Sequence, residues 1–188
     1  MDRTLPLTAA HKTARMGWAE EHILEPDKWI SIIFSDEKKL NLDGPDGFKY
    51  YWRDMRRPAP AYVRRQNGGG SVMVWGASWY GARSVLQQDN ASIHASRETK
   101  QFLEENEMST MVWPDRSPDG NPIDNVWSAM AAKVYAHGLQ YHTVAELDPR
   151  CWDAIGQEYL LRLVESMPRR CLAVIKQKGG LTKYKLLI

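Results

Sequence analysis

The stretch "SVLQQDNASIH", residues 84–94, places a short apolar segment directly before a carboxylate. Ser84–Gln88 is predicted to be a buried strand, and it stops abruptly at Asp89. Trp29–Phe34, "WISIIF", is a second β-branched and aromatic run of the kind that a central strand needs, and it also ends beside an acid, Asp36. Since α/β folds place their sites at the ends of central strands, these two acids predict a polar site at one edge of a sheet.

The remainder of the chain predicts further strands that are followed by alternating strands and helices. Strands are expected at Val72–Trp79 and Ser109–Trp113, and as a hairpin of Lys39–Leu42 with Phe48–Trp52. Helices are expected at Thr8–Leu24, Ser92–Glu107, Ile123–His137, Trp152–Glu165 and Pro168–Lys178. Pro114–Pro122 must be a loop, because it contains three prolines and a glycine. This order predicts an α/β fold with helices packed on a mixed sheet.

Length and composition exclude several classes of protein. With 188 residues, of which 43% are hydrophobic, the chain is expected to form one domain. It has no apolar run near the roughly 18 residues of a membrane span and no secretion signal, so we expect a soluble, intracellular protein. The two cysteines, Cys151 and Cys171, lack the spacing of a zinc site and are expected to be ordinary buried thiols.

The net charge of +2 is unevenly distributed. The stretch from Arg53 to Arg65 contains five arginines against one aspartate, and the stretch from Cys151 to Ile188 contains seven basic residues against three acids. Such patches suit a polyanion, whose phosphates release counterions when they are neutralised. A solvated surface is the alternative that charge alone leaves open.

A third acid, Asp124, stands in the first turn of the helix that follows the proline-rich loop. Carboxylates held together repel one another unless a cation neutralises them. Hard oxygen ligands in a sparse set suit Mg²⁺ or Mn²⁺, and a pair of such ions can assist phosphodiester displacement. The alternative is that Asp89 and Asp124 only form a turn or cap a helix.

At these residues the sequence resembles the catalytic domain of Tc1/mariner-type transposases, in the RNase H-like superfamily of DDE enzymes. The matching stretches are "IIFSDEKKLNL" around Asp36, "SVMVWGA" at Ser71–Ala77, "QQDNASIHAS" around Asp89, "WPDRSPDGNPIDNVW" around Asp124, and "SMPRRCLAVIKQKGGLTKY" near the end. The 34 residues between Asp89 and Asp124 equal the family's interval, and the third acid is Asp, as in mariner-like members.

The resemblance implies an RNase H-like mixed sheet flanked by helices, with an N-terminal helix or linker at 1–28 and the catalytic domain at 29–188. It implies metal-dependent DNA cleavage and strand transfer with two Mg²⁺ or Mn²⁺ ions. The implied partners are the transposon ends, the target DNA and a second copy in a homodimer, and the implied location is the nucleus.

The resemblance also assigns site residues. Asp36, Asp89 and Asp124 become the metal-binding triad. The residues that match positions around the family's site are Asn90, His94, Asn121, Pro122 and Asn125. The residues implied to contact DNA or a partner subunit are Arg53, Arg56, Arg57, Arg64 and Arg65. Asn90 and His94 could instead cap or pin the next helix, and Trp127 is expected on the buried face of its helix.

The sequence departs from the family between the strand at Val72–Trp79 and Asp89. The family has a further strand, a helix and a loop there, whereas Tyr80–Val85 spans the whole interval here. We therefore expect an internal deletion near residues 80–85, which exposes the face that the missing helix covers. The helix-turn-helix modules that recognise transposon ends are also not found. The alternative function is a catalytically inactive remnant that acts as a nucleic-acid-binding or dimerisation module.

Overall fold

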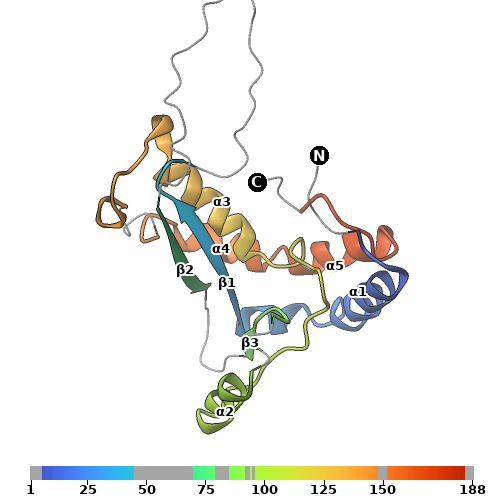
Figure 1. Cartoon of the computed structure of the whole chain (residues 1–188). Helices are drawn as coiled ribbons and strands as arrows, with labels where there is room; N and C mark the ends of the chain where they lie inside the picture. The colour runs from blue at the N-terminus through green and yellow to red at the C-terminus, as the bar shows by residue number, and fades with distance from the viewer. Residues whose placement is uncertain are drawn as a thin grey trace, which may run out of the picture.

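A mixed sheet in the order β2-β1-β3 organises the part of the chain that the structure describes (Figure 1). The computed structural model describes residues 6–44, 70–78, 85–91, 94, 96–147 and 152–184. The strands are β1 (Ile32–Asn41), β2 (Ser71–Ser78) and β3 (Val85–Gln87). The α-helices are α1 (Ala9–His22), α2 (Arg97–Glu105), α3 (Ile123–Val134), α4 (Gln157–Val164) and α5 (Met167–Lys176). Short 3-10 helices occupy Pro26–Ser31, Ala136–Gly138 and Val144–Glu146.

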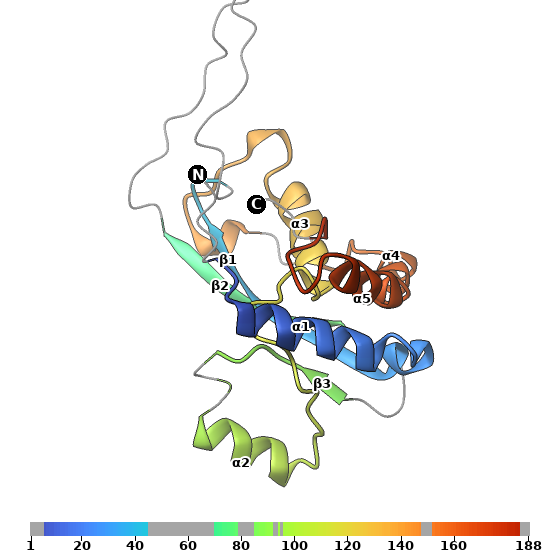
Figure 2. The same cartoon turned by 90° about the vertical axis from the view of Figure 1, so that its right-hand side faces the viewer.

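The central strand β1 pairs antiparallel with β2 and parallel with β3. Helices α3, α4 and α5 lie together on one side of β1 and β2, whereas α2 lies apart from them beyond β3 (Figures 1 and 2). Helix α3 packs against β1, and α1 packs against α5. The predicted α/β class and the mixed sheet flanked by helices are therefore confirmed.

The predicted strand Trp29–Phe34 is wrong at both of its ends. Trp29 lies in a 3-10 helix that begins at Pro26, and β1 continues through Asp36 as far as Asn41. Proline favours the start of a helix, and pairing with β2 provides backbone partners along β1 beyond Asp36. Residues 39–41, predicted as one arm of a hairpin, thus belong to β1, while the other arm, Phe48–Trp52, lies outside the described residues.

Helices α1 and α3 match their predicted ranges more closely. Thr8 forms a capping box with His11 at the start of α1. Helix α3 ends at Val134 rather than at His137, and the apolar residues that repeat at helical spacing along it are all buried; these are Ile123, Val126, Trp127, Met130 and Val134.

Two predictions along the chain between β3 and the proline-rich loop were wrong. Helix α2 begins at Arg97, after the N-cap Ser96, and ends at Glu105, so it is shorter than the predicted Ser92–Glu107. Ser109–Trp113 is not a strand, because Thr110 makes only one bridge, to Leu86. Among the described residues, none of the helices combines the length and the apolar character that crossing a membrane requires.

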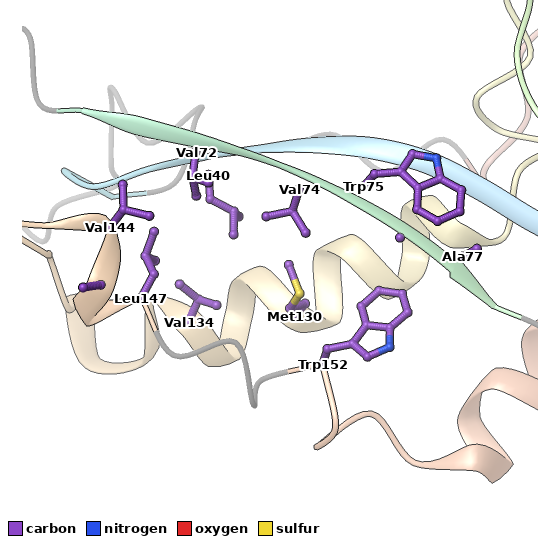
Figure 3. Close-up of a pocket in the computed structure, with 12 residues that line it drawn as sticks. Leu40, Val72, Val74, Trp75, Ala77, Met130, Val134, Val144, Leu147 and Trp152 are labelled. Atoms are coloured by element: carbon purple, nitrogen blue, oxygen red, sulfur yellow. The ribbon is translucent and has the colours of Figure 1, made fainter. Parts of the chain in front are cut away.

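An apolar cavity of about 680 Å³ lies between β2 and α3 and is also lined by Val144, Leu147 and Trp152 (Figure 3). Val74 and Met130 stand on facing walls of this cavity. None of the three predicted metal ligands lines it.

A buried ion pair joins three segments that are distant in sequence. The Arg15 guanidinium donates to both carboxylate oxygens of Asp119 at 2.8 Å, and both side chains are almost completely buried. Arg15 also donates to the backbone oxygens of Arg116, Gly179 and Gly180. These contacts connect α1 to the proline-rich loop and to the segment after α5.

We predict that Asp119→Ala lowers the free energy of unfolding by about 3–5 kcal/mol, because it leaves a buried guanidinium without its counter-ion. Urea denaturation at pH 7 measures this change. The control is Glu158→Ala, which removes the exposed pair with Arg162 and should change stability by less than about 0.5 kcal/mol. Equal losses in the two variants would show that the buried pair contributes no more than the exposed one.

Candidate functional site

The three predicted acids line one pocket of about 580 Å³. Asp36 lies within β1, Asp89 lies just beyond β3, and Asp124 lies in the first turn of α3. Parallel pairing of β1 with β3 and packing of α3 on β1 place them around the same cavity. Within the described part of the chain, however, no group of three His, Cys, Asp or Glu residues is arranged so that it could hold a metal ion. The fold therefore brings the acids to one cavity without closing them into a finished coordination shell.

Asp36 and Asp124 are partly buried, and negative charges of neighbouring acids act on both, those of Glu37 and Asp89 on Asp36 and that of Asp36 on Asp124. Burial raises the pKa of Asp36 to about 6, and the hydrogen bond from the indole Nε1 of Trp127, at 3.1 Å, opposes that rise. Burial, together with the negative charge of Asp36, raises the pKa of Asp124 to about 7. The pocket thus holds two carboxyl groups that are difficult to ionise together at neutral pH.

Asp89 is more exposed than the other two acids. One of its carboxylate oxygens accepts a hydrogen bond from the backbone N–H of Ala91 at 3.0 Å, so it forms the local turn that was one reading of the sequence. The same oxygen lies 3.5 Å from Nε2 of His94, and that nitrogen lies 3.2 Å from a carboxylate oxygen of Glu37 on β1. His94 therefore connects the segment after β3 to β1.

The predicted asparagines fix the backbone around the pocket. Asn90 donates to the backbone oxygen of Trp113 at 2.9 Å and to the carboxylate of Asp115, so it pins the start of the proline-rich loop. Asn121 donates to the backbone oxygen of Ser35 at 3.1 Å, which holds the end of that loop beside Asp36. Both asparagines line the pocket.

Asn125 faces a different partner. Its side-chain oxygen accepts a hydrogen bond from Arg170 of α5 at 2.6 Å. Arg170 is buried, also donates to the backbone oxygen of Asp119, and its positive charge partly opposes the rise in the pKa of Asp124. Pro122 is buried and precedes the first residue of α3. Asn125 therefore joins α3 to α5 rather than lining the cavity.

Sequence reasoning missed two contributors to the site. It did not assign a role to Arg170. The neighbouring residues Arg169 and Arg170 look alike in the sequence, so no local pattern indicates that Arg170 is buried. It placed Trp127 on the buried face of its helix, which is confirmed, but it did not predict the hydrogen bond to Asp36. The arginines predicted to contact DNA, from Arg53 to Arg65, lie outside the described residues.

Comparison with known sequences gives consistent matches. Residues 76–148 match a family described as DDE superfamily endonuclease. The chain is 36% identical to the Tc3 transposase of Caenorhabditis elegans over 215 residues, covering 95% of this chain and 65% of that protein. It is 32% identical to the Tcb1 transposase of Caenorhabditis briggsae, covering 93% of this chain and 78% of that protein. The chain thus spans about two thirds to four fifths of the length of such relatives.

Comparison with solved structures confirms the fold. The catalytic domain of Mos1 mariner transposase matches with a TM-score of 0.69 at 13% identity, covering 95% of this chain and 98% of that one. The Mos1 paired-end complex with Mg matches with a TM-score of 0.79 at 16% identity, covering 97% of this chain and 66% of that one. The predicted RNase H-like architecture is therefore correct.

We predict that the metal-free chain is less stable at pH 8 than at pH 5. The folded-state pKa values of Asp36 and Asp124, about 6 and about 7, exceed the value of about 3.9 for an unfolded aspartate. The folded state thus binds protons more tightly, and the associated stability is lost as pH rises through about 4 to 7. Thermal denaturation in EDTA measures the difference.

Asp124→Asn should remove much of this pH dependence, whereas Asp153→Asn, at an exposed position, should leave it intact. The same fall in melting temperature in wild type and Asp124→Asn would contradict the assignment.

Proposed function

Because the chain belongs to the Tc1/mariner family of transposases, we propose that it is a catalytic domain that cleaves DNA and transfers the cut strands. The observation that carries this proposal is the convergence of Asp36, Asp89 and Asp124 on one pocket. Since the chain spans only 65% of the Tc3 transposase, recognition of particular DNA ends is not assigned to the residues described above.

The proposed cofactor is Mg²⁺ or Mn²⁺, held as a pair of ions by Asp36, Asp89 and Asp124. The donor atoms fit such cations, because they are hard carboxylate oxygens and two of the carboxyl groups have raised pKa values that a cation would lower. When bound, the cations supply the charge that assists attack on a phosphodiester and departure of the leaving oxygen. Asp89 and Asp36 already interact, because the negative charge of Asp89 contributes to the raised pKa of Asp36.

The protein's own groups prepare the pocket for this chemistry. Asn121 anchors the proline-rich loop on β1 beside Asp36, and Asn90 anchors the other end of that loop. His94 holds Asp89 toward Glu37 of β1. These contacts tie the segments that carry the three acids to one another, which supports a site of defined geometry.

The proposed substrate is DNA, and the proposed assembly is a homodimer acting in the nucleus. The support is the family and the paired-end DNA complexes of Mos1, which share this fold. The five arginines between Arg53 and Arg65 are proposed to contact phosphates or the second copy.

We also propose that the catalytic domain spans 29–188 and is shortened near residues 80–85. Alignment with the Tc3 transposase runs over 215 positions, more than the 188 residues of this chain, so the relative contains residues that this chain lacks. On β2, close to that interval, Met73 and Trp75 are 62% and 56% exposed, as expected of a face that has lost its cover.

We predict that Asp89→Asn reduces metal-dependent DNA nicking by about 10³-fold or more, because it removes a charged ligand but keeps the side-chain shape. Nicking of supercoiled plasmid with Mg²⁺ or Mn²⁺ measures this. Asp153→Asn, which changes an exposed acid, is the matched control. Identical nicking by wild type and Asp89→Asn would refute the assignment.

The inactive remnant is the alternative outcome of the same assay. In that case wild type would not nick DNA with either metal, yet it would bind DNA in EDTA. Such binding would weaken with added salt and would depend on Arg56 and Arg57 more than on the three acids.

A further inference from the structure

Trp127 connects the buried face of α3 to the first acid of the pocket. The indole is completely buried, and its Nε1 donates to Oδ2 of Asp36 at 3.1 Å. An indole N–H can only donate, so this contact orients the carboxylate without adding a charge to the pocket. Packing holds the donor rigidly, since the ring of Trp127 lies 5.4 Å from the ring of Trp152.

The strand opposite Asp36 provides the space for this indole. Gly76 on β2 is the register partner of Asp36 in the antiparallel pair. A Cβ atom on Gly76 would lie 2.6 Å from Cη2 of Trp127 and 3.0 Å from the ring of Trp152. Figure 3 shows Trp152 beside α3, below β2. A side chain at this position of β2 would therefore displace the indole that reaches Asp36.

Trp127 is also linked to the third acid through its own helix. Asp124 and Trp127 are three residues apart on α3, so they occupy neighbouring positions on its surface. One turn of α3 thus carries one acid of the pocket and the donor that orients another. A shift of this turn would therefore move Asp124 and the hydrogen-bond donor to Asp36 together.

We propose that Trp127 is a positioning residue that holds Asp36 near Asp124 for cation binding. Gly76, which has no side chain, leaves the space that the Trp127 indole occupies. The inference rests on the proposed function, because it concerns the same three acids. It differs from a purely structural role in one respect: removal of the N–H should impair cation binding even when an aromatic ring is retained.

The test compares Trp127→Phe with Trp29→Phe. Trp29 is equally buried, but its Nε1 has no hydrogen-bond partner within the described residues, so it controls for the loss of indole volume. We expect Trp127→Phe to bind Mn²⁺ about tenfold more weakly and to lower kcat for nicking with little change in KM for DNA. Trp29→Phe should match wild type in both. Electron paramagnetic resonance of free Mn²⁺ measures the affinity.

Equal Mn²⁺ affinity in wild type and Trp127→Phe, together with weaker binding in Asp36→Asn, would overturn this inference and leave the proposed function standing. Absence of saturable Mn²⁺ binding in wild type would count against the proposed function itself. The two outcomes therefore distinguish a failure of this inference from a failure of the proposed function.

A second arm needs no metal. Gly76→Ala should lower the melting temperature of wild type, and should lower that of Trp127→Phe by clearly less, because phenylalanine lacks the distal ring that the new methyl group would meet. Asp36→Asn should shift the indole N–H resonance that disappears in Trp127→Phe. Equal losses from Gly76→Ala in both backgrounds, or an unshifted resonance, would contradict the proposed geometry.

Discussion

Two carboxyl groups, Asp36 and Asp124, are held near one another in a partly buried pocket, and much of the surrounding structure serves to keep them there. Burial disfavours the ionised form of each group, and the charge of Asp36 further disfavours ionisation of Asp124. Left to relax, two such groups would separate or become protonated. The fold instead fixes both, which is the arrangement expected of a site that is completed by a cation.

The contacts that maintain this arrangement come from distant parts of the chain. Asn121 ties the proline-rich loop to β1, and Arg170 ties α3 to α5 through Asn125. The pair of Arg15 and Asp119 then fixes the same loop to α1 and to the segment after α5. Since a buried charge without its partner is strongly destabilising, this pair makes the position of the loop depend on both ends of the described chain.

Sequence reasoning predicted the features that local pattern determines. The strand before Asp89, the helices at α1 and α3 and the burial of Trp127 follow from period and residue type, and they are confirmed. It failed where pairing between distant strands determines the bounds of an element, as in β1, which continues beyond Asp36 because it pairs with β2. The burial of Arg15 and Arg170 has no local signal, because a buried arginine and an exposed one look alike until their partners are brought together. The acids themselves were chosen through resemblance to a family, since spacing alone did not distinguish them from helix caps.

The account depends on whether the three acids bind a divalent cation together. Thermal denaturation at pH 8, with and without Mn²⁺, tests this most directly, because a ligand that binds only the folded state raises its melting temperature. We expect a cooperative transition that Mn²⁺ shifts upward in wild type, and no shift in the double variant Asp36→Asn with Asp124→Asn. An upward shift of equal size in both proteins, or none in wild type, would contradict the shared site.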